Sequence, residues 1–197
     1  MQRGLRYTSS AAESRDFAMR VPAILKFAAA WAMAVAAIAT PAAKPQSSPP
    51  AIAGADTVLK PTDMQKLLPA SVYYKGQSAT TQLRNSGGVK FADGYFVLAS
   101  LVDTSGYSTD VQAKYSAYFI TEVPLKMGGQ NLPAGVYGAG FVADNKFVVT
   151  DVGAHDLLAV DSGNDAGLKR PMPLQVIADP AGGFRLYSGR RYVVFSR

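Results

Sequence analysis

The sequence predicts an all-β protein: a mostly antiparallel sandwich or small barrel of about eight to ten strands, with one short N-terminal helix. After residue 69, turn-forming residues recur roughly every eight to twelve positions, with short apolar stretches between them. Glutamate, a strong helix former, occurs only at positions 13 and 122, whereas the chain has 18 glycines and 12 prolines. Frequent turns are therefore expected, and long helices are not.

Residues 1–39 have the pattern of a secretory signal peptide. Arg20 and Lys26 form a positive n-region, and Phe27–Ala39 is an uncharged apolar core that ends in a small-x-small cleavage motif. The core of about 13 residues is shorter than the roughly 20 that span a bilayer, which favours cleavage over a retained anchor. Because a complete signal begins at Met19, this residue is the favoured initiator. The expected location is periplasmic or extracellular, with no transmembrane segment after cleavage.

Residues 40–55 are rich in Pro, Ala and Ser and predict an extended tether. Residues 56–197 then form a single β domain, large enough to bury about two-thirds of its unfolded surface. The formal charge of the chain is +6, and residues 1–39 hold five basic and two acidic side chains, or +3 of it. The remainder is near +3, and this modest excess predicts no nucleic-acid partner.

The domain begins with the short helix and continues as strands. Thr62 has an N-cap side chain for a helix over residues 63–68, and Pro69 ends it. Residues 95–102 are apolar on both faces, which predicts a central strand buried on both sides. Residues 115–123 alternate in the way of a strand with two different faces.

A hairpin is the clearest local prediction. Residues 136–143 and 146–152 are rich in β-forming side chains and flank Asp144-Asn145, a pair that suits a type I′ turn. Pro171 and Pro173 favour an edge or strand-start position for the strand that follows them. That strand opens a C-terminal meander, predicted at residues 174–178, 184–188 and 192–195.

The run from Met127 to Tyr137 contains Gly128-Gly129, then Leu132-Pro133-Ala134-Gly135 and Tyr137. It resembles a Gly-Gly-x-x-Leu-Pro-Ala-Gly-x-Tyr segment of uncharacterised secreted bacterial β-sandwich proteins. The resemblance covers a turn and implies a fold. It implies no activity, cofactor or site residue.

Composition excludes several chemistries. With no cysteine the chain has no disulfide, thiolate metal site or cysteine nucleophile, and with one histidine it has no site that needs two imidazoles. Asp161, Asp165 and the carbonyls of residues 162–167 offer Ca²⁺ ligands, but their spacing is not that of an EF-hand, and a flexible acidic loop is favoured. We expect no metal and no cofactor.

Two enzymatic arrangements stay open. In the first, His155 is the base of a serine triad; the adjacent Asp156 points to the opposite face, so the orienting acid is another residue, such as Asp103 or Asp151. In the second, two carboxylates act as in glycosidases. The candidates for that pair are Asp103, Asp110, Asp151, Asp156 and Asp161.

The favoured function is an exported β-domain that acts as a non-enzymatic binding or envelope-associated module. Its partner is an unknown small molecule, glycan or envelope protein. The alternatives are a periplasmic hydrolase that uses His155 or an Asp pair, and a structural subunit of an envelope assembly. Loops at 104–110, 153–156 and 190–191 are expected to converge at one rim. The candidate ligand-binding residues there are Tyr107, His155, Asp156, Arg190 and Arg191.

Overall fold

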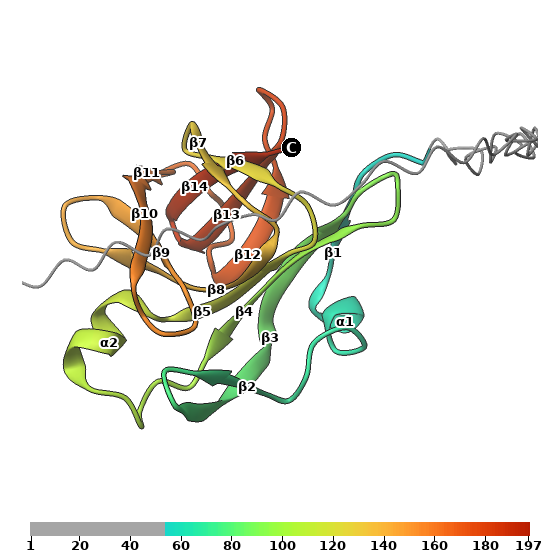
Figure 1. The fold of residues 1–197 in the computed structure, drawn as a ribbon. Coiled ribbons are helices and arrows are strands. Elements are labelled where there is room, and N and C mark those ends of the chain that lie inside the picture. The colour runs from blue at the N-terminus through green and yellow to red at the C-terminus, as the bar shows by residue number, and fades with distance from the viewer. Residues whose placement is uncertain (1–53) are drawn as a thin grey trace, which may run out of the picture. The chain divides into compact units, whose positions relative to one another are not determined.

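A computed structural model describes residues 54–197, which form two antiparallel sheets (Figure 1). The predicted signal peptide and all but the last two residues of the predicted tether lie outside the described residues. Within residues 54–197 the sheets are separate and do not close into a barrel, so the predicted fold class is confirmed in its sandwich form. No helix in this part of the chain is long and apolar enough to cross a membrane.

The larger sheet has eight strands and the order β1-β3-β4-β5-β8-β9-β10, with β2 also paired to β3. Every pairing in it is antiparallel. Its strands are β1 (Thr57–Leu59), β2 (Ser71–Tyr74), β3 (Gln77–Lys90), β4 (Phe96–Val102), β5 (Ala117–Thr121), β8 (Gly135–Val142), β9 (Lys146–Thr150) and β10 (Asp156–Asp161).

The smaller sheet has the order β12-β13-β14-β6-β7, with β11 also paired to β14. The predicted C-terminal meander is confirmed as three of its strands, and the first of them lies at the sheet edge. Residues 54–197 contain fourteen strands rather than the predicted eight to ten. The difference comes from short strands such as β11, because two or three residues carry too little alternation to be recognised in a sequence. The strands are β6 (Leu125–Met127), β7 (Gln130–Leu132), β11 (Gly163–Asn164), β12 (Met172–Ala178), β13 (Phe184–Gly189) and β14 (Arg191–Ser196).

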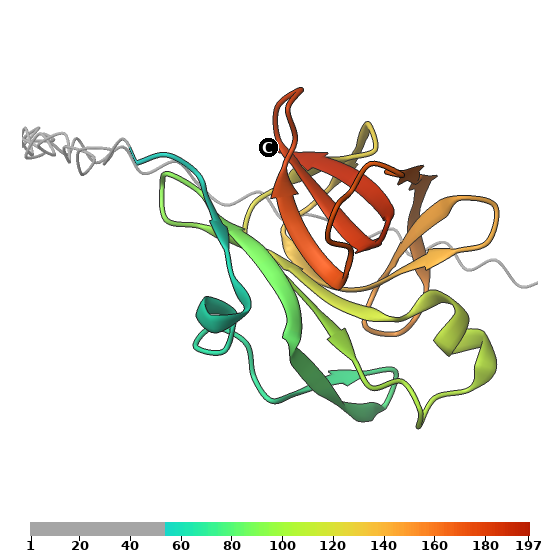
Figure 2. The ribbon, with the colours of Figure 1, turned by 180° about the vertical axis from the view of Figure 1, so that it is seen from behind.

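The main core lies between the two sheets. Phe119 and Phe147 enter it from the larger sheet, and Leu186 and Phe195 enter it from the smaller one. Strand β4 also buries Leu98 on its opposite face, so the predicted burial of this strand on both sides is confirmed. Figure 2 shows α1 and α2 on the other side of the larger sheet, away from the smaller sheet.

Helix α1 spans Pro61–Met64, and its N-cap is Lys60 rather than the predicted Thr62. Pro61 takes the first helical position, where its missing N–H costs nothing, and Asp63 accepts a hydrogen bond from the Lys60 N–H at 3.0 Å. Helix α2 (Thr109–Lys114) was not predicted, because its six residues follow directly on a polar loop. It packs on β8, where a side chain at Gly140 would collide with the carbonyl that ends the helix.

The predicted type I′ hairpin is confirmed. Asp144 and Asn145 both have positive φ, 54° and 53°, as this turn requires, and they join β8 to β9. A second turn of this kind, Lys75 (φ 44°) and Gly76 (φ 78°), joins β2 to β3. It places Lys75 against the end of β9, where the Lys75 N–H donates to the Val152 carbonyl at 2.7 Å.

Candidate functional site

Tyr107, a candidate ligand-binding residue on the 104–110 loop, is buried. The residue is 6% exposed, and its ring packs edge-on against Tyr74 and Tyr115. Its hydroxyl donates to the carbonyls of Tyr74 and Gln77, at 3.0 and 3.2 Å. The loop around Tyr107 is polar, but the β2–β3 hairpin supplies a partner for the ring, Tyr74, from 33 residues away. Tyr107 is therefore part of a buried cluster and does not present its ring to a ligand.

The three predicted loops do not meet at one rim. The 153–156 loop and the 104–110 segment lie at the same end, since Ala154 packs against the cluster that contains Tyr107. The 190–191 loop lies at the opposite end of β9, because the Arg191 guanidinium donates to the carbonyls of Val142 and Lys146, where β9 begins. The two ends of β9 are about 13 Å apart at 3.3 Å per residue. Residues 190–191 are thus not part of the same rim as the 104–110 and 153–156 loops.

Of the two acids considered for His155, the structure selects Asp151. Its Oδ2 lies 2.8 Å from His155 Nδ1, while its Oδ1 accepts the backbone N–H groups of Gly153 and His155 at 2.8 and 2.9 Å. These bonds, with that from the His155 backbone first, lower the pKa of the Asp151 carboxyl. Asp103 instead accepts the N–H of Ser105.

A triad nevertheless lacks its nucleophile. The His155 side chain is 80% exposed, and among residues 54–197 no serine, threonine or tyrosine hydroxyl is hydrogen-bonded to its ring. Asp151 closes the β9–β10 turn through its backbone bonds, which accounts for its position without catalysis.

Of the three remaining carboxylate candidates, Asp156 and Asp161 form ion pairs with lysines, while Asp110 is exposed and forms no ion pair with any described residue. Asp156 lies 2.6 Å from Lys114 Nζ, and Asp161 lies 2.6 Å from Lys146 Nζ. The described part of the chain contains no group of three or more His, Asp or Glu side chains that could hold a metal ion. In particular, Asp165 accepts a hydrogen bond from the Tyr187 hydroxyl at 3.0 Å instead of joining Asp161.

Arg190 has a clear structural role: it holds the 165–170 loop. One guanidinium nitrogen, Nη1, donates to the carbonyls of Asp165, Ala166 and Leu168, at 3.3, 2.7 and 2.8 Å. The Arg190 carbonyl in turn accepts the Asp165 N–H at 2.9 Å. Gln175 Nε2 of β12 donates to the carbonyl of Arg170 at 3.2 Å and secures the far end. The loop that the sequence suggested to be flexible is therefore bound to the sheet at both ends.

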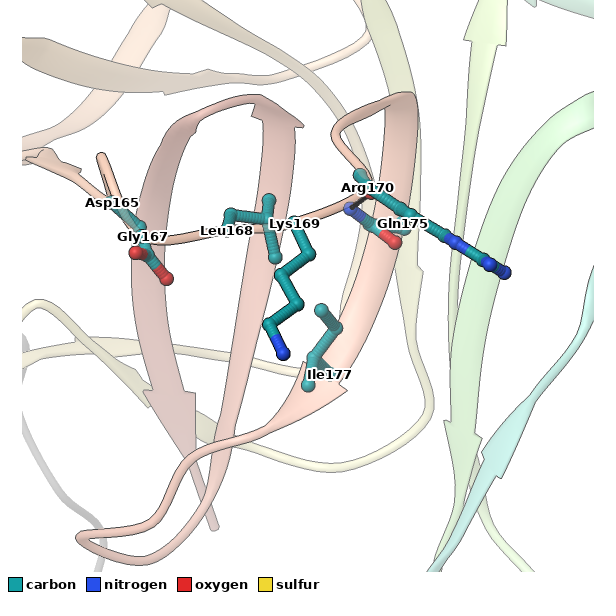
Figure 3. A pocket seen from close by; sticks show the side chains of 7 residues that line it. All are labelled: Asp165, Gly167, Leu168, Lys169, Arg170, Gln175 and Ile177. Atoms are coloured by element: carbon teal, nitrogen blue, oxygen red, sulfur yellow. Dashed lines mark hydrogen bonds between the residues drawn. The ribbon is translucent and has the colours of Figure 1, made fainter.

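Beneath this loop lies a shallow groove of about 710 Å³ along the outward face of β12 (Figure 3). Leu168 and Ile177 are half-buried and provide its apolar surface. Figure 3 shows Asp165 at one end and Arg170 at the other, with Leu168 and Lys169 between them. The lining residues are Asp165, Gly167, Leu168, Lys169, Arg170, Gln175 and Ile177.

The groove combines positive charge with apolar surface. Lys169 and Arg170 are exposed, and neither forms an ion pair with any described carboxylate. Arg190 was among the candidates predicted from the sequence, whereas Lys169 and Arg170 were not. The adjacent Lys-Arg pair is visible in the sequence as two neighbouring cations. That they line a groove is not visible, because the groove also needs Gln175 and Ile177 of β12, which lie beside the loop only in the folded chain.

Comparison of the chain with known protein families, curated proteins and solved structures finds no match. The resemblance based on Met127–Tyr137 therefore stays a prediction. In the structure this segment forms the β6–β7 hairpin and the link into β8. Its turn consists of Gly128 (φ 54°) and Gly129 (φ 86°), positions where residues with a side chain are strained.

Proposed function

We propose that this chain is an exported, non-enzymatic binding module whose groove under the 165–170 loop takes a ligand with a carboxylate or phosphate group. The observation that carries the proposal is the pair of cations, Lys169 and Arg170, without carboxylate partners among the described residues, on a loop that Arg190 holds in place.

Pre-organisation is what makes the two cations a site rather than two mobile surface side chains. Because Arg190 already binds three loop carbonyls, an incoming anion would not have to order the backbone, which removes a large cost of association. Arg170 adds a planar fork that matches the two oxygens of a carboxylate or phosphate, and Lys169 adds a point charge.

The apolar lining indicates that the ligand is more than an inorganic anion. Leu168 and Ile177 present hydrocarbon beside the cations, so a ligand with an apolar portion next to its charged group would bury surface that a free ion cannot. Such groups occur on lipids, on modified glycans and on acidic protein segments. This fits the predicted export and the envelope partner that the sequence suggested.

Hexyl phosphate is a suitable probe, because it joins one anionic group to a short apolar chain. We expect saturable binding by calorimetry, with amide shifts in residues 165–177 by NMR. K169Q/R170Q should weaken binding on the order of tenfold, since each exposed pair contributes about 0.5–1 kcal/mol. The charge-matched control K60Q/K66Q alters exposed lysines near α1 and should bind as the wild type does.

A second arm distinguishes the source of the anionic group. Co-sedimentation with vesicles of phosphatidylcholine and phosphatidylglycerol (3:1), against phosphatidylcholine alone, tests a lipid headgroup. Binding of hexyl phosphate without vesicle binding indicates a soluble ligand. Equal affinities of both double variants for hexyl phosphate, or no saturable binding at all, would refute the proposed site.

The contact between His155 and Asp151 favours one alternative, a hydrolase with His155 as general base. This function predicts that p-nitrophenyl acetate hydrolysis, after subtraction of the buffer rate, falls at least a hundredfold in H155A while unfolding stays unchanged. Equal hydrolysis rates of the wild type and H155A would refute the hydrolase, and the binding function would then be the one that stands.

A further inference from the structure

A small second cavity, far from the groove under the loop, lies at the α2 end of the larger sheet. Its volume is about 180 Å³. It is formed where the β2–β3 turn, helix α2 and the end of β9 come together, and this juxtaposition depends on the hydrogen bond from the Lys75 N–H to the Val152 carbonyl. The lining residues are Tyr74, Lys75, Asp110, Val111, Lys114, Thr150 and Ala154.

Two hydroxyls lie at the base of this cavity, those of Tyr74 and Thr150. They bind each other at 2.7 Å, and the Thr150 hydroxyl also lies 3.2 Å from the Gly138 carbonyl. Tyr74 is 1% and Thr150 0% exposed, so these hydroxyls close the base of the cavity, and a ligand contacts the other lining residues.

The charges around the cavity have both signs. Asp110 and Lys75 are exposed and form no ion pair with any described residue, while Lys114 is paired with Asp156 at 2.6 Å. A ligand ammonium would be attracted to Asp110, and a ligand carboxylate to Lys75 and Lys114. A ligand with a charge of one sign only would pair with either Asp110 or the lysines, but not with both.

The volume restricts the ligand further. At about 180 Å³ the cavity is well below the roughly 300–1,000 Å³ of a typical pocket for a drug-sized ligand, so its ligand is small. A small α-amino acid meets this limit, and Val111 and Ala154 supply an apolar surface for a short side chain. We infer that this cavity binds a small zwitterion of the α-amino acid class, independently of the ligand of the larger groove.

Calorimetric titration with glycine and L-alanine tests the inference. We expect saturable binding, with acetate and ethylammonium, which carry one charge each, at least fivefold weaker. D110N and K75Q should each reduce affinity for L-alanine on the order of fivefold, as the loss of one exposed charge pair predicts. D144N is the matched control, because Asp144 is exposed, forms no ion pair among residues 54–197 and lies at the far end of β9.

Thermal unfolding of each variant shows whether it is folded, and amide shifts of residues 74–75 and 110–114 by NMR report occupancy without reliance on any one variant. The inference is overturned if neither amino acid binds saturably, if acetate binds as well as L-alanine, or if D144N weakens binding as much as D110N. Because K169Q/R170Q changes only the larger groove, it should bind L-alanine normally.

Discussion

Three buried tyrosines allow a sharp test of the aromatic cluster at the α2 end. The rings of Tyr74 and Tyr115 stack with centroids 3.7 Å apart and an interplanar angle of 15°. Their hydroxyls differ: that of Tyr74 binds Thr150, whereas that of Tyr115 is buried and has no hydrogen-bond partner among the described residues. Tyr115 is 0% exposed, so water does not reach its ring from outside.

The two Tyr→Phe substitutions should therefore act in opposite directions. Y115F keeps the stack and removes a buried polar group that gains nothing from the protein, so the free energy of unfolding should stay equal or rise by about 1 kcal/mol. Y74F loses a buried hydrogen bond and should cost about 1–2 kcal/mol. The two variants thus differ by about 1–3 kcal/mol, which for a domain of this size corresponds to midpoint temperatures roughly 3–12 °C apart.

Urea and thermal unfolding, followed by circular dichroism, measure both values against the wild type. Y107F is the third member of the series and should resemble Y74F, because its hydroxyl binds two backbone carbonyls. If Y115F proves as destabilising as Y74F, the Tyr115 hydroxyl has a partner, and the account of this cluster is wrong.

Three other predictions concern stability. Burial raises the pKa of the Tyr115 hydroxyl above its ordinary value near 10, so the stability that depends on its protonated form is complete below pH 10 and declines above it. The urea midpoint of the wild type should therefore fall between pH 8 and 11, and that of Y115F should fall less. G140A places a Cβ against the backbone carbonyl that ends α2 and should cost about 1–3 kcal/mol in urea unfolding. G106A should be tolerated, because its Cβ would lie 3.4 Å from a Gln77 side-chain oxygen, an ordinary van der Waals contact. The Arg185 guanidinium lowers the pKa of the Asp179 carboxyl, so the stability that the ionised carboxylate contributes is present above pH 4 and is lost as the pH falls further. In D179N the free energy of unfolding should therefore depend less on pH between pH 2 and 5.

Features with local causes were predictable. The Asp144-Asn145 turn needs positive φ at two neighbouring residues, and its chemistry is complete within the four residues of the turn. The C-terminal meander follows from alternation and Gly-rich turns in one continuous stretch. The existence of helix α1 was predicted, but its bounds were not: the helix begins two residues before the predicted 63–68, because Pro61 takes the first helical position, and it ends at Met64 rather than before Pro69.

The candidate site was harder to predict, because its parts come from separate segments. Arg190 was recognised as a basic residue at a turn, but its three carbonyl partners lie 22 to 25 residues earlier in the chain. The burial of Tyr107 was not predictable from its polar loop, because its ring partner Tyr74 lies 33 positions away. For His155 the sequence offered Asp103 and Asp151 as examples of an orienting acid, and the geometry of the β9–β10 turn places Asp151 beside it.

The amino-acid sequence alone determined the fold class, the central strand, the main hairpin and the exclusion of thiol and multi-histidine chemistry. Each of these depends on composition or on residues within one strand and its turn, where side-chain alternation and backbone φ act directly. The tertiary structure decided which loops meet, which tyrosines are buried and which cations are left without carboxylate partners in the described chain. Those outcomes depend on how two sheets pack, and packing joins residues whose separation along the chain carries no local signal.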